Sequence, residues 1–151
     1  MSQSLVKQYA HIVFSTKYRH PFLIDKKIRR ELFAYMVGIL QNLDCIPVII
    51  GGVADHVHIL TSISKSFSIS KIVGEVKRVS SLWIKTKEGI PDNFYWQNGY
   101  GAFSVGKKDL DIVRRYIENQ EWHHNEKTYQ DEYVKILDEN DVEYNEKYVW
   151  D

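Results

Sequence analysis

The sequence predicts an α+β fold, a ferredoxin-like or RNA-recognition-like sandwich in which one antiparallel sheet carries helices on one face. Three observations predict this class. Segments typical of strands and helices alternate in the order β-α-β-β-α-β, the two middle strands are joined by a glycine-containing turn, and each helical segment has a single apolar stripe. The chain has 151 residues, enough for one domain with its own core.

The first half of the chain supplies two strands of a hairpin, preceded by a strand and a helix. Residues 9–16, YAHIVFST, are rich in strand-forming side chains. Asp25 precedes an amphipathic segment that runs to about position 43, so we expect a helix capped by that aspartate. Residues 46–53 and 56–63 are two apolar runs on either side of a short turn, which predicts two paired strands.

The second half continues with a helix over about 68–87 and two short strands around a glycine-rich turn in 93–105. Helical periodicity then predicts one helix over 107–126 and another near 128–140. We therefore expect a single domain, 1–151, made of a sheet–helix core (1–106), a helix (107–126) and an acidic C-terminal helix and tail (127–151).

Charge is unevenly distributed although the net charge is zero. Residues 1–90 contain 13 Lys and Arg against 6 Asp and Glu, whereas residues 91–151 contain 7 against 14. This asymmetry favours a basic face for a polyanion and an acidic end that points away from it. Without an apolar run of membrane-spanning length, a secretory signal or a second cysteine, the sequence predicts a cytoplasmic protein that contacts no membrane.

Two histidines, His56 and His58, stand one residue apart in an otherwise apolar strand. Side chains at i and i+2 of a strand share a face, so the two imidazoles lie side by side. We expect their strand to be central in the sheet and the second face of the sheet to be free for a ligand. The alternative is a purely structural pair of buried histidines.

Tyr116 and Gln120 are four residues apart on a predicted helix and are therefore neighbours at the edge of its apolar stripe. Two imidazole nitrogens and an amide oxygen would make a three-ligand site for a divalent metal, and a tyrosine hydroxyl alongside could attack a phosphodiester. His124 competes with Gln120 as the third ligand. The alternative for Tyr116 is a packing role at the edge of the core.

Five motifs occur in a fixed order: HIVFSTKYRHPFL, GGVADHVHIL, VKRVSSLWIK, WQNGYGAFSV and VRRYIENQEWHH. With them the chain resembles, over nearly its whole length, the single-tyrosine HUH (His–hydrophobic–His) transposases of the insertion-sequence-200/605 family. The resemblance implies that His56 and His58 are the metal-binding pair, Gln120 the third ligand and Tyr116 the nucleophile.

The resemblance also implies a function. Such an enzyme binds single-stranded DNA hairpins at the ends of a mobile element and cleaves and rejoins strands through a 5′-phosphotyrosine, with Mg²⁺ or Mn²⁺ and without ATP. It implies a homodimer in which the tyrosine helix of one chain lies against the histidines of the other. Two features of the sequence favour the same sharing of sites between chains: Gly106 could act as a hinge, and the apolar stripe of the following helix needs a surface to pack on.

Basic residues near the first strand and on the second long helix are expected to contact DNA phosphates: Lys17, Arg19, Lys71, Lys77, Arg78, Lys85 and Lys87. Two other functions compete with the enzyme. One is a catalytically idle host protein that binds hairpin DNA or RNA, and the other is a sheet-based RNA-binding module. The presence of Tyr116 together with the histidine pair favours the enzyme, because a pure binder needs neither.

Overall fold

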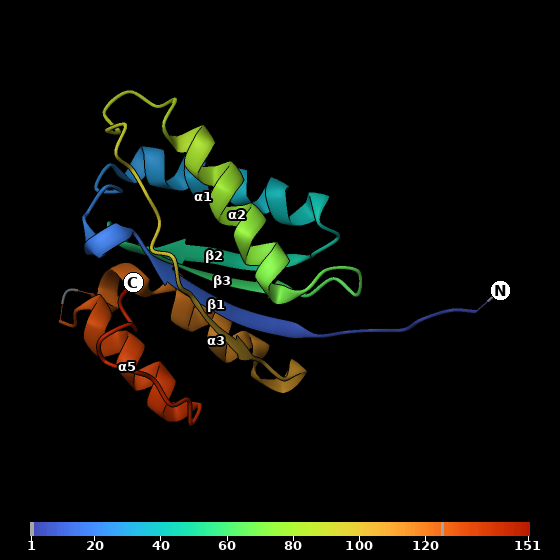
Figure 1. The fold of residues 1–151 in the computed structure, drawn as a ribbon. Helices are drawn as coiled ribbons and strands as arrows, with labels where there is room; N and C mark the ends of the chain where they lie inside the picture. Colours follow the sequence, from blue (N-terminus) through green and yellow to red (C-terminus); the bar gives the residue numbers. More distant parts are fainter. Residues whose placement is uncertain (1, 125) are drawn as a thin grey trace.

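One four-stranded antiparallel sheet runs through the molecule in a computed structural model that describes residues 2–124 and 126–151 (Figure 1). Its strands are β1 (Tyr9–Ser15), β2 (Pro47–Gly52), β3 (His56–Ser62) and β4 (Gly101–Ser104). They lie in the order β2-β3-β1-β4, and each neighbouring pair is antiparallel. The predicted α+β class is confirmed, and the histidine-bearing strand β3 is central.

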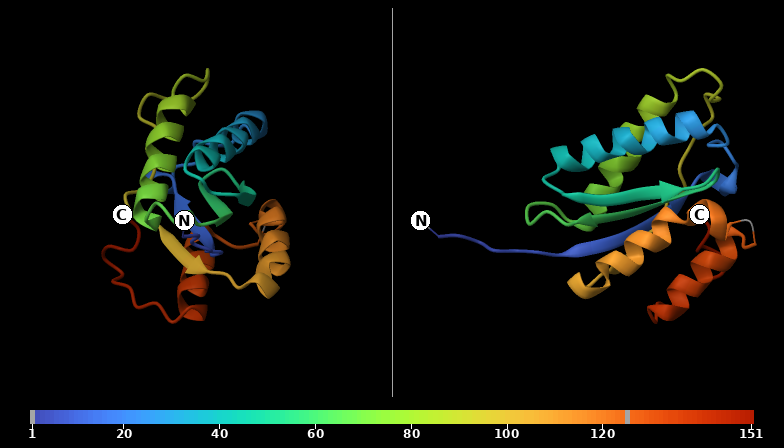
Figure 2. Two further views of the ribbon diagram at one scale, coloured as in Figure 1. Left: turned by 90° about the vertical axis from the view of Figure 1, so that its right-hand side faces the viewer. Right: turned by 180° about the vertical axis from the view of Figure 1, so that it is seen from behind.

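Helices cover both faces of this sheet (Figures 1 and 2). The upper face in Figure 1 carries α1 (Lys26–Asn42) and α2 (Ile69–Ile84). The lower face carries α3 (Leu110–Glu118), α4 (Gln120–His123) and α5 (Tyr129–Glu139), and two short 3₁₀ helices, η1 (Lys17–Arg19) and η2 (Lys107–Asp109), lie in the connections. The expectation of a free second face is therefore wrong, because the C-terminal helices occupy it.

The helices of the upper face begin where the sequence predicts. The Asp25 carboxylate accepts hydrogen bonds from the backbone N–H groups of Lys27 and Ile28, and the Ser68 hydroxyl accepts one from Lys71. These caps satisfy N–H groups that have no partner within the helix. The apolar stripes of both helices pack on the sheet residues Ala10, Ile12, Phe14, Val57 and Ile59 to form the main core.

Two predicted elements differ from the structure. Residues 93–105 contain only β4, and Trp96 makes just an isolated bridge with Thr16. The helix predicted over 107–126 starts as η2, breaks at Asn119 (φ −97°, ψ 19°) into α3 and α4, and ends at His123 instead of residue 126. Residue 125 of the predicted span lies outside the described residues. The break changes the direction of the chain between Tyr116 and Gln120, two of the predicted site residues.

Helix α3 packs closely against the sheet of its own chain. Ile117 is buried against β2, and a Cβ added at Gly51 would lie 2.7 Å from the Ile117 carbonyl oxygen. Glycine at 51 therefore permits this approach. Beside α3, four side chains of α5 (Tyr129, Tyr133, Ile136 and Leu137) form a second apolar cluster with Val13 and Phe103.

Candidate functional site

The alternation of β3 places His56 and His58 on the lower face of the sheet, beneath the C-terminal helices. Both side chains are fully buried. Val57 and Ile59, which alternate with them, point to the main core on the upper face. One strand thus serves a hydrophobic core and a polar site at the same time.

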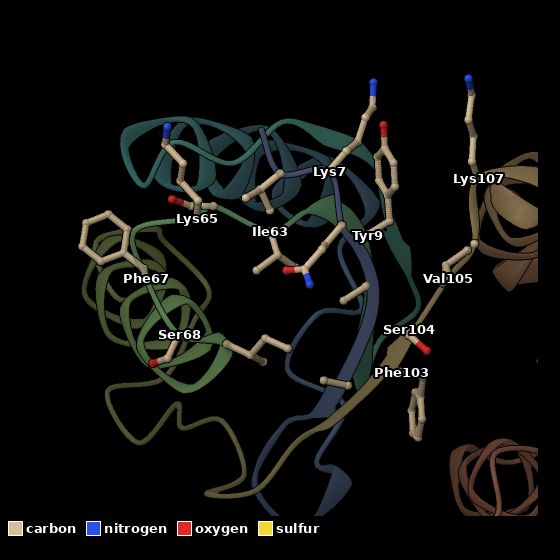
Figure 3. A pocket seen from close by; sticks show the side chains of 17 residues that line it. Lys7, Tyr9, Ile63, Lys65, Phe67, Ser68, Phe103, Ser104, Val105 and Lys107 are labelled. Atoms are coloured by element: carbon tan, nitrogen blue, oxygen red, sulfur yellow. The ribbon is translucent and has the colours of Figure 1, made fainter. Parts of the chain in front are cut away.

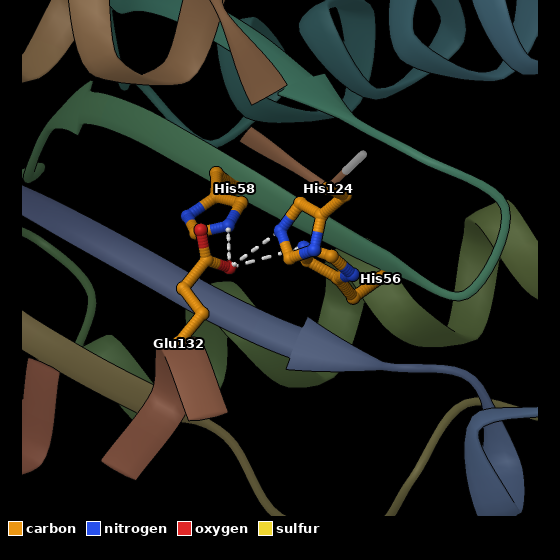
Figure 4. Close-up of side chains that lie close together, drawn as sticks. All are labelled: His56, His58, His124 and Glu132. Atoms are coloured by element: carbon orange, nitrogen blue, oxygen red, sulfur yellow. Dashed lines mark hydrogen bonds and ion pairs between the residues drawn. The ribbon is translucent and has the colours of Figure 1, made fainter. Parts of the chain in front are cut away.

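Four buried side chains, His56, His58, Gln120 and Glu132, and the partly buried His124 converge on this face and are called the polar cluster below. Figure 4 shows four of them, with the Glu132 carboxylate facing the three imidazoles. Glu132 Oε1 lies 3.2 Å from Nε2 of His56, 2.9 Å from Nε2 of His58 and 3.1 Å from Nε2 of His124. The sequence predicts His124 only as a competing ligand, and it does not predict Glu132.

Gln120 enters the polar cluster because the chain breaks at Asn119. Its side chain is 1% exposed, and its Oε1 lies 3.1 Å from Nε2 of both His56 and His124. Its Nε2 donates a hydrogen bond to Glu132 Oε2 at 3.0 Å. This hydrogen bond orients the amide with its oxygen toward the imidazoles. Gln120 Oε1 and His124 Nε2 therefore both remain candidates for the third metal ligand.

Tyr116 lies at the edge of the polar cluster with its side chain partly buried. Its hydroxyl donates a short hydrogen bond to Glu132 Oε2, and its ring meets the rings of His11 and His58 edge-on at centroid distances of 6.3 and 5.8 Å. Burial, and the negative charge of Glu132, raise the pKa of Tyr116 far above its ordinary value. The phenol is therefore protonated in this arrangement.

The outward nitrogens of the two β3 histidines also have partners. His56 Nδ1 lies 2.7 Å from Asp55 Oδ1, and His58 Nδ1 lies 2.8 Å from His11 Nε2. An imidazole that uses Nε2 for a metal keeps its proton on Nδ1 and donates it to an acceptor. Asp55 and His11 are such acceptors, so both imidazoles can present a free Nε2 to a cation.

Opposing influences set the charges in the polar cluster. Burial lowers the pKa of His56, but hydrogen bonds to Asp55 and Glu132 outweigh it and raise the pKa to about 9. For His58, burial prevails and lowers the pKa to about 4. Burial would raise the pKa of Glu132, yet the hydrogen bonds from His124, His56 and His58 hold it well below its ordinary value. The carboxylate is therefore charged.

The donor set fits a divalent metal. The three imidazole Nε2 atoms and a carboxylate oxygen all lie within 4.8 Å of one another, with the Gln120 amide oxygen beside them. Imidazole and carboxylate are ordinary ligands of divalent cations, and a bound cation would take the place of the Nε2 proton that His56 now directs at Glu132. Glu132 could have been suspected from the sequence only as an acidic residue on the otherwise apolar stripe of α5.

The basic residues predicted to contact DNA mostly lie away from the polar cluster. Four are on α2 or just beyond its end, on the opposite face of the sheet: Lys71, Lys77, Arg78 and Lys85. Lys77 faces inward, because its ammonium donates to the backbone carbonyls of residues 97–99 and burial lowers its pKa to about 8. Arg78 is mostly exposed and paired with Glu75.

The other basic residues predicted to contact DNA either pair with groups of the chain itself or lie in the loop after β1. Lys87 pairs with Glu31, and Arg19 donates to the Trp150 carbonyl. Lys17 lies over the ring of Tyr18 in that loop. For all these basic residues, contact with DNA stays a prediction.

Two cavities differ in their relation to the polar cluster. One, of about 1030 Å³, lies by the start of β1 and α2 with Lys7, Lys65 and Lys107 along its rim, and shares no residue with the cluster (Figure 3). The other, of about 1010 Å³, adjoins the cluster at His124. Its lining includes the exposed aromatics Tyr18 and Trp122 and four basic residues, Arg19, Lys26, Arg29 and Lys127. Of these two cavities, the second is the one that could bring a nucleic acid to the cluster, and a smaller one of about 330 Å³ is lined by Tyr116 and Glu132.

Across the described residues, none of the helices has both the length and the apolar character needed to cross a membrane.

Comparisons with known proteins point to transposases. The model of the IS200-like transposase family matches residues 4–120. Two transposases for insertion sequence element IS200, from Salmonella typhimurium strain LT2 and Salmonella typhi, are each 32% identical over 122 residues, which cover 73% of this chain and 74% of the relative.

Solved structures share the fold. A candidate transposase from Deinococcus radiodurans R1 matches with a TM-score of 0.58 at 23% identity, over 80% of this chain and 98% of that one. A REP-associated tyrosine transposase bound to a REP hairpin matches with a TM-score of 0.59 at 15% identity, over 82% and 74%. With a family model that spans most of its length and relatives at 32% identity, the chain belongs to the IS200-like transposase family.

Proposed function

We propose that this transposase binds single-stranded DNA hairpins and cleaves and rejoins DNA strands with Tyr116 as the nucleophile. The observation that carries the proposal is the position of the Tyr116 hydroxyl, which lies at the edge of a set of side chains that could hold a metal ion and donates to Glu132. The hairpin in the related structure supports the kind of substrate.

In the proposed reaction, the Tyr116 oxygen attacks the phosphorus of a phosphodiester and forms a 5′-phosphotyrosine. The bond from phosphorus to the 3′ oxygen breaks, and the phenolic proton passes through Glu132, its hydrogen-bond acceptor, so that the leaving strand ends in a 3′-hydroxyl. Attack by a 3′-hydroxyl on the phosphotyrosine reverses these bonds and joins strands. One ester replaces another, so no ATP is needed.

His56, His58 and Gln120 would hold the divalent metal, Mg²⁺ or Mn²⁺. When bound, such a cation supplies positive charge that polarises a phosphate oxygen and favours the phenolate. Asp55 and His11 keep the two imidazoles in the required orientation. The single strand would enter along the cavity next to His124, where Tyr18 and Trp122 can stack on bases and the exposed Lys26 and Lys127 can contact phosphates.

The homodimer with shared sites is a separate part of the proposal. In the single chain, Tyr116 lies beside the chain's own histidines, so sharing requires α3 to move to the partner through the connection at 105–109. Gly106 has an ordinary backbone conformation (φ −71°, ψ 153°), which any residue adopts. Residues 105–109 are suited to act as a hinge because they are largely exposed, and not because residue 106 is a glycine.

The test of the function is incubation with labelled single-stranded hairpin DNA and Mg²⁺, followed by denaturing electrophoresis. The wild type should yield a cleaved strand and a covalent protein–DNA adduct, and Tyr116→Phe should yield neither while binding the hairpin with nearly unchanged affinity. Cleavage by Tyr116→Phe would remove Tyr116 from the nucleophile role. Binding without cleavage by the wild type would favour an idle hairpin-binding protein.

A mixing experiment tests the sharing of sites. The Tyr116→Phe variant and the His56→Ala/His58→Ala double variant should each be inactive alone. If sites are shared, a heterodimer pairs intact histidines with the partner's intact tyrosine, and cleavage returns. Continued inactivity in a mixture shown to exchange subunits would assign each site to one chain.

A further inference from the structure

We propose that Glu132, carried by α5, is a ligand of the same cation as His56 and His58 and also holds Tyr116 and Gln120 in place. The inference rests on the proposed function for the role of the site. It adds a third element, α5, to a centre that the sequence predicts on β3 and the tyrosine helix. Glu132 also lies beyond residues 4–120, the part of the chain that the family model matches.

The two carboxylate oxygens of Glu132 have different partners. Oε2 accepts hydrogen bonds from the Tyr116 hydroxyl and from Gln120 Nε2, which anchors the carboxylate to the segment that carries the nucleophile. Oε1 is left facing Nε2 of His56, His58 and His124 at 2.9–3.2 Å. One oxygen thus serves the nucleophile and the other serves the metal-binding atoms.

The charge of the site favours a bound carboxylate. Glu132 is only 5% exposed, and a buried carboxylate needs a positive partner or several hydrogen-bond donors. When His56 and His58 turn a lone pair on Nε2 toward a cation, they stop donating to Oε1. The cation then becomes the partner that Oε1 needs, and the carboxylate offsets part of a charge that neutral imidazoles and an amide cannot offset.

The position of Glu132 on α5 explains how its carboxylate reaches the polar cluster. Glu132 occupies the same helix face as Tyr129, Tyr133 and Ile136, which pack on Val13 and Phe103 of the sheet. The packing of these side chains fixes the helix, and the helix fixes the carboxylate. Removal of its charge should therefore affect the metal more than the fold.

The test is Mn²⁺ binding to the DNA-free protein, measured by electron paramagnetic resonance and calorimetry. Glu132→Gln should weaken Mn²⁺ binding about 10- to 100-fold. Asp138→Asn, which removes an exposed carboxylate from the same helix, should leave it unchanged. At saturating Mn²⁺, Glu132→Gln should bind the hairpin as the wild type does but form the adduct more slowly, because a neutral amide does not take up the phenolic proton as the carboxylate does.

Unchanged Mn²⁺ affinity of Glu132→Gln would overturn the inference, and tighter binding would overturn it by showing that the carboxylate competes with the cation. Should Glu132→Gln fail to fold by circular dichroism, Glu132→Asp keeps the charge but withdraws the oxygens, and the same loss of affinity is expected. Metal binding does not require Tyr116. Cleavage by Tyr116→Phe would therefore contradict the proposed function and leave this inference standing.

Discussion

The upper face of the sheet, under α1 and α2, and the lower face, under α3, α4 and α5, are both buried, but different interactions hold them. Phe14 and Ile59 on the upper face belong to the main apolar core. On the lower face, His56 and His58 are equally buried and are held by hydrogen bonds to Asp55, His11 and Glu132. Apolar burial stabilises by area, whereas a buried polar set mainly avoids a penalty.

This difference separates stability from function. A face that only packs tolerates exchanges of similar volume, because its free energy depends on filled space. A face built of interlocked hydrogen bonds loses several partners when one side chain changes. Four substitutions, ordered from the largest expected effect to the smallest, test how far the two faces are separate.

The largest effect should come from Phe14→Ala on the upper face. The ring is fully buried against Trp96 and the helices above it, so truncation should lower the free energy of unfolding by about 3–5 kcal/mol. Urea denaturation measures the loss. The fraction that remains folded should still cleave hairpin DNA at the wild-type rate, and a slower rate would show that the upper face also controls the site.

On the lower face, His56→Ala or His58→Ala should reduce strand cleavage about 100-fold and weaken Mn²⁺ binding. The same assay separates the two candidates for the third ligand. If Gln120 is the ligand, Gln120→Ala weakens Mn²⁺ binding more than His124→Ala does, and the reverse order would assign His124. Equal Mn²⁺ affinity in the wild type and both β3 variants would refute the metal assignment.

Gly51→Ala tests the contact that joins the lower face to the tyrosine helix. An added methyl would meet the Ile117 carbonyl, so α3 must shift, at a cost of about 1–3 kcal/mol and with slower cleavage. Gly74→Ala on α2 is the matched control. Apart from its neighbours in the chain and the nearby backbone of α2 itself, no atom of the described residues lies within 4 Å of the added methyl there, so this change should stabilise by about 0.5–1 kcal/mol. A neutral Gly51→Ala would mean that α3 does not dock at β2 in solution.

The smallest effects concern the basic residues of α2. If this surface binds DNA, Arg78→Glu should lower the slope of log affinity against log salt by about one unit. Lys77→Met should instead lower stability by about 1 kcal/mol, because its ammonium serves carbonyls within the chain. Lys147→Glu in the C-terminal tail is the control for the slope. An identical slope for Arg78→Glu and Lys147→Glu would place the DNA elsewhere.

Much of the fold follows from local patterns in the sequence. The alternation of β1 and β3, the caps at Asp25 and Ser68, and the helical stripes all depend on residues within a few positions of one another. Local patterns failed at Asn119, where helical periodicity continues across a break. They also failed for residues 93–105, because the pairing of a strand depends on a partner far away in the chain.

The sequence by itself determined that His56 and His58 share a face and that Tyr116 and Gln120 lie on one segment, because the periods of strands and helices set these relations. Only the tertiary structure decided that the two pairs meet in one chain, that α3 and α5 close the second face of the sheet, and that Glu132 joins them. The reason is physical. Glu132 is 74 residues from His58, and contacts at that separation arise from the packing of whole helices on a sheet, which no local pattern records.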